Sequence, residues 1–261
     1  MMLPITVAEL TEYAPLAVAH AHPDDETLST GPLLNTLVEL GAEVMVITAT
    51  RGERGEIRAD VDDPRPLVDI RRDELAAALR ALGVSNHAYL GGDTRHYPDS
   101  GMRWIEPDRA GPDDSAPEEC FSRADISTEI ADLARAVTQF GAGAIISYDD
   151  VGTYGHPDHV RMAHVARGCA AKLGVPMVEI VSLPTHVDAG DSPAILPTFA
   201  GEFNNLAASL PAVRAALGAY GTQLEIVCDI ADRDFRGVRV RHVGGQFQDI
   251  WAYAPMRLVT R

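Results

Sequence analysis

Short apolar runs alternate along this chain with longer segments in which apolar residues recur at helical spacing. The apolar runs have the length of buried strands, and they cover residues 16–20, 43–50, 87–90, 144–148 and 177–183. The helical patterns between them cover roughly residues 32–40, 70–82, 126–140 and 160–173. The first of these helices can also begin earlier, with Pro32 in its first turn or at a kink. Because strands that alternate with helices form parallel pairs with right-handed crossovers, this order predicts an α/β fold with a doubly wound, mostly parallel, Rossmann-like sheet.

The C-terminal end of the chain has a different pattern. After a predicted loop over residues 184–204, a helix is expected over 206–217, and three short strands follow without helices between them, over 224–230, 238–243 and 250–254. We therefore predict a Rossmann-like catalytic domain over residues 1–205, and a small β-rich appendage over residues 206–261 that packs on the same domain. A chain of 261 residues is long enough for one such domain with a sizeable core.

The net charge of the chain disfavours some classes of binding partner. The formal net charge of −16 disfavours binding to nucleic acids and to an anionic membrane surface, so a small-molecule partner is expected.

No apolar run reaches the roughly 18 residues of a membrane helix, and the first basic residue is Arg51, so no signal-peptide pattern is present. The cysteines Cys120, Cys169 and Cys228 form no Cys-x-x-Cys motif and fit free thiols of a reducing compartment. We expect a cytoplasmic protein, and a homo-oligomer remains possible.

Two dense clusters of metal-ligand side chains each follow a predicted strand. The first is Ala19-His20-Ala21-His22-Pro23-Asp24-Asp25-Glu26, and the second is Tyr154-Gly155-His156-Pro157-Asp158-His159. Open α/β sheets place their sites beyond the carboxyl ends of the strands, so the two clusters are expected to meet in space. A glycine-containing charged loop over residues 51–56 follows the predicted strand 43–50, so it also lies at the carboxyl ends of the strands.

These residue types suit a catalytic zinc site, which uses three protein ligands and one open position. His22 and Asp25 can reach one ion from a strand–helix turn, and His159 or His156 can supply the third ligand. Asp24 lies next to a ligand and fits a general base for the metal-activated water. The remaining histidine would stabilise the oxyanion or protonate the leaving amine. Iron(II) can occupy similar nitrogen and oxygen sites.

Each cluster also has a simpler interpretation. The acids Asp24, Asp25 and Glu26 would complement the dipole of a helix that begins near Pro23. His156 and His159 would be polar loop residues, and His20 is expected in the core. The segment 93–120 is too long for a plain connection and is expected to be a functional loop. Nucleotide binding has little support, because neither Gly-x-Gly-x-x-Gly nor a Walker lysine motif occurs.

The segment Ala21–Glu26, taken with His156-Pro157-Asp158-His159, resembles the PIG-L/LmbE-like family of zinc-dependent N-deacetylases, and Thr48–Glu53 also fits. The resemblance implies a hydrolase in which zinc is held by His22, Asp25 and His159. It further implies that Asp24 is the general base and that Tyr154 polarises the carbonyl. His156 would assist the transition state, oriented by Asp158.

Further segments resemble the actinobacterial enzymes of the mycothiol pathway, the N-acetylglucosaminyl-inositol deacetylase and the mycothiol S-conjugate amidase. These segments are Arg71, Glu74-Leu75, 77–84, 89–92 and 99–102. By that resemblance Arg71 and Asp99 contact the sugar–inositol substrate, whereas their simpler roles are a surface residue and a turn residue before Gly101.

Residues 27–33 and the C-terminal block depart from the family pattern, which leaves the substrate open. Removal of an acetyl group from an amino-sugar conjugate is the first expectation. Amide cleavage in a thiol conjugate and deacetylation of an antibiotic or glycan sugar are alternatives. A non-catalytic glycan-binding module is the alternative from another class.

Overall fold

The computed structural model describes residues 2–106, 108–184, 186–187, 190–192 and 204–259. Its main sheet has seven strands in the order β1-β15-β8-β7-β2-β3-β4. The central strands run parallel, and they are β2 (Leu16–His20), β3 (Val44–Thr48), β4 (Asn86–Tyr89), β7 (Ala144–Tyr148) and β8 (Met177–Ile180). The predicted doubly wound, mostly parallel sheet is confirmed.

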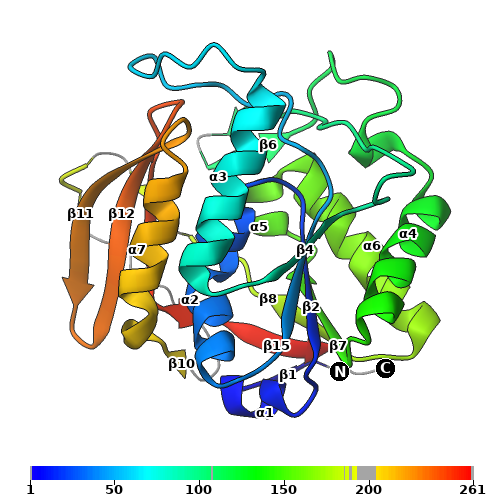
Figure 1. The fold of residues 1–261 in the computed structure, drawn as a ribbon. Coiled ribbons are helices and arrows are strands. Elements are labelled where there is room, and N and C mark those ends of the chain that lie inside the picture. The colour runs from blue at the N-terminus through cyan, green and yellow to red at the C-terminus, as the bar shows by residue number, and fades with distance from the viewer. Residues whose placement is uncertain (1, 107, 185, 188–189, 193–203, 260–261) are drawn as a thin grey trace.

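Helices cover both faces of this sheet (Figure 1). One face carries α2 (Asp25–Glu39) and α3 (Leu67–Leu82), with α7 (Leu210–Ala219) packed against these two helices, and the other face carries α4 (Ile126–Phe140) and α6 (Pro157–Leu173). Alternate residues of a strand point to opposite faces, so Leu16 and Val18 enter the first core while Ala17 and Ala19 enter the second. The apolar runs are strands buried on both faces, which explains why they lack polar alternation.

Local signals set several helix ends. The Asp125 side chain caps α4 by accepting from the Thr128 N–H, and Gly141 ends that helix with φ 77°. The helix predicted over 126–140 is therefore confirmed in its bounds. Of the two starts left open for the first helix, the earlier one is found: α2 begins at Asp25, and Pro32 lies inside it. This earlier start places the acids of the first cluster on the first turn of a helix.

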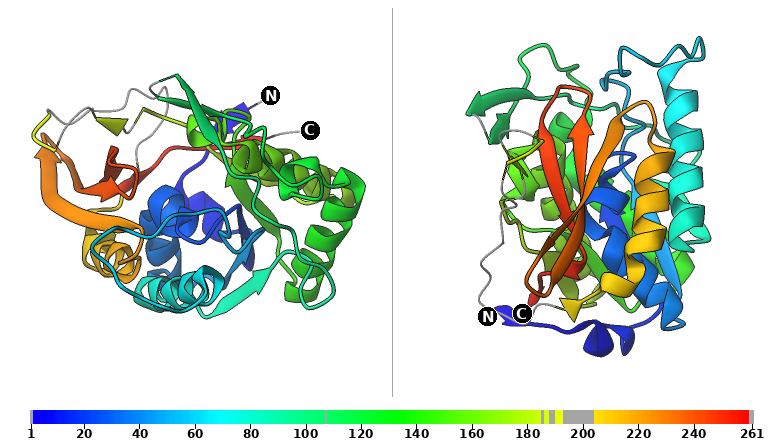
Figure 2. Two further views of the ribbon diagram at one scale, coloured as in Figure 1. Left: turned by 90° about the horizontal axis from the view of Figure 1, so that it is seen from above. Right: turned by 90° about the vertical axis from the view of Figure 1, so that its left-hand side faces the viewer.

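The C-terminal part forms a second sheet beside α7 (Figures 1 and 2). This sheet is antiparallel and has the order β11-β12-β13-β9, with β11 (Leu224–Asp232), β12 (Phe235–His242), β13 (Phe247–Trp251) and β9 (His186–Val187). β14 (Tyr253–Ala254) pairs with β10 (Asn204–Asn205). Of the loop expected over 184–204, residues 185, 188–189 and 193–203 lie outside the described residues, and β9 corrects the expectation at 186–187, where pairing with β13 makes a short strand.

The chain then returns to the main sheet, which the sequence did not indicate. β15 (Met256–Val259) pairs antiparallel with both β8 and β1 (Met2–Pro4), and α1 (Val7–Thr11) follows β1. The short elements that remain are β5 (Arg103–Glu106), β6 (Arg109–Gly111), α5 (Gly152–Gly155) and the 3-10 turns η1 (Phe121–Arg123) and η2 (Ala207–Ser209). Within the described residues, none of the helices combines the length and apolar character needed to cross a membrane.

Candidate active site

The strand order reverses between β2 and β7, and this is where an open α/β sheet forms its binding crevice. From β2 the chain proceeds to β3 and β4 on one side, while β7 leads to β8 on the other. The first histidine cluster follows β2 and the second follows β7. The topology thus brings the two clusters together, as the sequence predicted.

Donor atoms of three residues, with Asp25 contributing both carboxylate oxygens, lie at the mutual spacing of ligands around one metal ion. His22 Nδ1 is 3.3 Å from Asp25 Oδ2 and 3.3 Å from His159 Nε2, and His159 Nε2 is 3.2 Å from Asp25 Oδ1. Ligand atoms about 2.0–2.1 Å from a tetrahedral zinc ion lie roughly 3.3–3.4 Å from one another. These residues therefore fit a tetrahedral metal ion. His156 forms a second grouping with His22 and His159, in which the donor atoms lie within 4.8 Å of one another.

Carboxylates surround His22 on its other side. Its Nε2 lies 3.1 Å from Asp158 Oδ2 and 3.6 Å from Asp99 Oδ1. Burial alone would lower the pKa of His22, but Asp99, Asp158 and Asp25 raise this pKa well above its usual value. The same negative potential favours a divalent cation at Nδ1. A carboxylate on the second ring nitrogen also orients a metal-binding histidine.

Asp158 contacts His156 in a different way from the one expected by resemblance. The main-chain N–H of Asp158 donates to His156 Nδ1 over 3.1 Å, whereas the Asp158 carboxylate accepts from the Ser100 N–H and bonds His22. Because Nδ1 of His156 accepts, Nε2 carries the proton of the neutral ring. Burial, together with His22 and His159, lowers the pKa of His156 well below its usual value. His156 is therefore held as a neutral hydrogen-bond donor.

Asp24 lies beside the donor atoms in an unusual backbone conformation. It caps α2 with φ 119° and ψ −29°, and its N–H donates to Glu26 Oε2 over 3.1 Å. Left-handed backbone is strained for a residue other than glycine, and such strain is concentrated at functional sites. Burial and the neighbouring Asp25 raise the pKa of Asp24 well above its usual value. A carboxylate of raised proton affinity suits proton transfer.

Arg71 and Asp99 both line the same cavity. Arg71 is 2% exposed and donates to the Glu56 carbonyl over 2.8 Å, so its interpretation as a surface residue is wrong. Asp99 is also buried, and its Oδ1 accepts from the Gly101 N–H over 2.7 Å, which is the expected turn contact. Since Asp99 also approaches His22, it belongs both to the turn and to the site.

Comparisons with known proteins show which family shares this arrangement of residues. The family model for GlcNAc-PI de-N-acetylase, PIG-L, matches residues 17–170. The chain belongs to the PIG-L family. The 1D-myo-inositol 2-acetamido-2-deoxy-alpha-D-glucopyranoside deacetylase of Kineococcus radiotolerans is 34% identical, over 92% of this chain and 76% of that protein. The protein of the same description from a Nocardioides species is 41% identical, over 62% of this chain and 55% of that protein. The chain thus spans about half the length of the second relative.

Solved structures of deacetylases share the fold of this PIG-L chain. The crystal structure of the antimicrobial reagent A40926 pseudoaglycone deacetylase has a TM-score of 0.55 and 18% identity, over 80% of this chain and 82% of that one. The deacetylase–bog complex from the biosynthesis pathway of teicoplanin has a TM-score of 0.53 and 19% identity, over 79% of this chain and 84% of that one.

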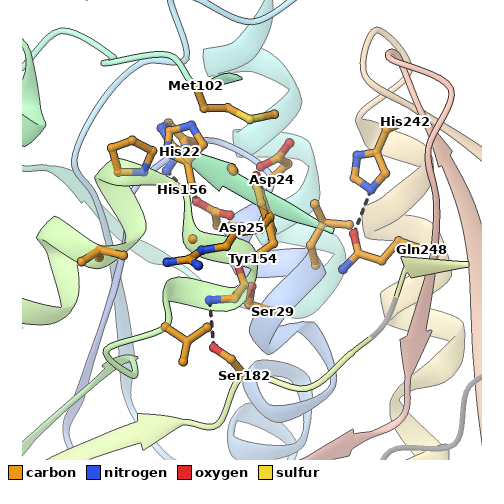
Figure 3. Close-up of a pocket in the computed structure, with 18 of the residues that line it drawn as sticks. His22, Asp24, Asp25, Ser29, Met102, Tyr154, His156, Ser182, His242 and Gln248 are labelled. Carbon is orange, nitrogen blue, oxygen red and sulfur yellow. Dashed lines mark hydrogen bonds and ion pairs between the residues drawn. The ribbon is translucent and has the colours of Figure 1, made fainter. Parts of the chain in front are cut away.

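The cavity of this PIG-L chain extends well beyond the donor atoms, to about 1700 Å³. The predicted functional loop 93–120 contributes the β5–β6 hairpin, and Trp104 of this hairpin lines the cavity together with Met102, which directly precedes β5. The Trp104 ring lies 5.5 Å from that of Tyr154. His242 and Gln248 line the cavity from the antiparallel sheet, and their side chains are joined by a 2.8 Å hydrogen bond (Figure 3). No spacing in the sequence connects these residues to the histidine clusters.

Two buried groups below the site were assigned only minor roles from the sequence. His20 is fully buried and bonds Thr30 Oγ1 over 2.8 Å, so the expected core position is confirmed. Glu26, for which the sequence offered only a role in complementing a helix dipole, is fully buried and accepts from the Tyr220 hydroxyl over 2.7 Å. Burial raises the pKa of Glu26 to about 7. Glu26 therefore links α7 to the main chain of Asp24.

Proposed function

We propose that this PIG-L chain is a metal-dependent hydrolase that removes the acetyl group from an N-acetylated amino-sugar conjugate of the N-acetylglucosaminyl-inositol type. The observation that carries the proposal is the ligand-like spacing of His22, Asp25 and His159 with the Asp24 carboxyl beside them. The names of the relatives support the amino-sugar substrate. The enzyme would act in the cytoplasm on a small molecule.

Zinc is the proposed metal, held by His22, Asp25 and His159, and iron(II) is an alternative ion for the same donors. When bound, the metal supplies a Lewis acid for the acetyl carbonyl and lowers the pKa of water to roughly 7. The carboxylates around His22 favour the cation electrostatically. Asp158 orients His22 for this purpose through Nε2.

The remaining residues handle protons and substrate. Asp24 accepts the proton of the attacking water, because its carboxyl has a raised proton affinity. The neutral His156 donates from Nε2 to the developing oxyanion, and Tyr154 polarises the same carbonyl; burial raises the pKa of the Tyr154 hydroxyl, which keeps it protonated. The amine leaves after protonation by Asp24 or His156. Arg71 and Asp99 bind the sugar hydroxyls.

A screen of the zinc-reconstituted protein tests this proposal. N-acetylglucosaminyl-inositol, other N-acetyl sugars and a bulky cysteinyl amide of glucosaminyl-inositol would be compared, with release of free amine as the readout. Faster turnover of the N-acetyl compound supports the deacetylase. Faster turnover of the cysteinyl amide would instead indicate the amidase of thiol conjugates. Binding without amine release from any compound would support a non-catalytic glycan-binding module and overturn the proposal.

A further inference from the structure

Thr153 contacts the proposed metal ligand His159 on the side away from the other donors. Its Oγ1 lies 2.9 Å from His159 Nδ1 and donates to the Gly152 carbonyl over 2.7 Å. A hydroxyl has a single proton, so at His159 the Thr153 oxygen accepts. The proton of the neutral imidazole is then on Nδ1, and Nε2 presents its lone pair toward His22 and Asp25.

We propose that Thr153 is a positioning residue that fixes the tautomer and ring orientation of His159 for metal binding. The inference rests on the proposed function, because it requires His159 to be a ligand. Metal-binding histidines are commonly fixed by an acceptor on their second ring nitrogen. For His22 this acceptor is Asp158, and for His159 it is Thr153. His159 is 1% exposed, so bulk water has little access to replace the hydroxyl.

The backbone of Thr153 supports this role. Its φ of 62° and ψ of −80° lie outside the regions that β-branched residues normally adopt. A glycine would adopt this φ without the same strain. The threonine side chain therefore makes the local backbone less favourable, and what it adds in return is the hydroxyl that faces His159.

The strained residue is held from the next strand of the sheet. The Thr153 N–H donates to Ser182 Oγ over 2.8 Å, and Ser182 lies just beyond the end of β8. Ser182 in turn donates to Asp149 through its N–H over 2.9 Å and through its hydroxyl over 2.5 Å. Asp149 is 3% exposed and follows β7 directly. A conformation of this kind persists only where its surroundings impose it, as these bonds do.

Three variants separate the contribution of the Thr153 hydroxyl to metal binding from the effect of the strained backbone. Thr153→Val keeps the β-branched shape and removes the hydroxyl, Thr153→Ser keeps the hydroxyl, and Thr153→Gly removes both the hydroxyl and the strain. Zinc affinity is measured by competition with a chromophoric chelator, and the thermal midpoint is measured on the metal-free proteins.

We expect wild type to hold one zinc per chain and Thr153→Val to bind it about 10–100-fold more weakly. Thr153→Ser should retain most of the affinity. Thr153→Gly should unfold at a higher temperature than wild type when metal-free, yet bind zinc more weakly. The loss in the glycine variant should be smaller than in the valine variant, since the vacated space admits a water that accepts from Nδ1.

Equal zinc affinity of wild type, Thr153→Val and Thr153→Gly would overturn the inference and leave the proposed function standing. A loss in Thr153→Ser as large as that in Thr153→Val would also overturn it, since the cause would then be packing. If wild-type protein bound no divalent metal, the proposed function would fail and the inference with it.

Discussion

The floor and the wall of the cavity are built in different ways. The floor consists of residues 22–26 and 153–159, after the two central strands; residues 22–25 and 153–157 line the cavity, and Glu26, Asp158 and His159 lie behind them. The wall consists of the β5–β6 hairpin and the β12–β13 strands. Just before the floor begins, the chain segments that leave β2 and β3 are joined by a main-chain bond from the Thr50 N–H to the Ala21 carbonyl over 2.9 Å. All residues of β5 are exposed. The floor can therefore hold the reacting groups in fixed positions, while the exposed wall can adjust to the shape of the substrate.

Metal removal should reduce the rate of amine release more than any other change, and it affects only residues of the floor. Treatment with a strong chelator should abolish amine release, because the water and the carbonyl then lose their activation. Zinc should restore the activity of wild type but not that of His22→Ala, which lacks one donor of the triad. Metal content is measured on the same samples. Full activity of a metal-free sample would contradict the division of labour between floor and wall.

Asp24→Asn should have the next largest effect. The carboxamide has nearly the same size but cannot accept a proton from water, so the rate should fall about 10²–10⁴-fold. Asparagine tolerates left-handed backbone, so the φ of 119° is accommodated and zinc content should remain that of wild type. Steady-state kinetics and metal analysis check both expectations. A variant that keeps zinc and full turnover would remove Asp24 from the mechanism.

The floor was predictable from the sequence because its signals are local. Dense ligand clusters directly follow β2 and β7, whose bounds match the predicted strands 16–20 and 144–148. The wall was predictable only in part: the long segment 93–120 was expected to be a functional loop, but its meeting with β12 and β13 depends on tertiary packing, as for Met102 and His242, which both line the cavity. The same holds for β15, which is an ordinary apolar segment until it pairs with β8.

Supporting contacts within the floor were equally hidden. Ser100 reaches Asp158 from the long loop, and Tyr220 reaches Glu26 from α7. Such bonds join residues far apart in the chain, and no spacing or periodicity records them. The sequence therefore revealed the residues proposed to act on the substrate but not most of those that orient them.

Tyr220→Phe tests whether the C-terminal part supports the floor. The change removes one hydroxyl from a buried pair, so the free energy of unfolding should fall by about 1–3 kcal/mol. The turnover rate should fall less than in Asp24→Asn, because Glu26 would still accept from the Asp24 N–H. Chemical denaturation of the metal-loaded protein measures the first effect. Tyr13→Phe, which removes the hydroxyl of a partly buried tyrosine packed against the same core, is the matched control.

Trp104→Ala should have the smallest effect and should act on the wall alone. The indole lies on an exposed hairpin beside Tyr154 and offers an apolar face to a sugar ring in the cavity. Loss of an aromatic contact of about 0.5–1.5 kcal/mol corresponds to a rise in KM of roughly 2–13-fold. The kcat should change much less, because the floor is untouched, and Trp104→Phe should recover most of the KM. If Trp104→Ala lowered kcat as strongly as Asp24→Asn while KM stayed constant, the hairpin would belong to the reacting part of the site, and the distinction between floor and wall would have to be abandoned.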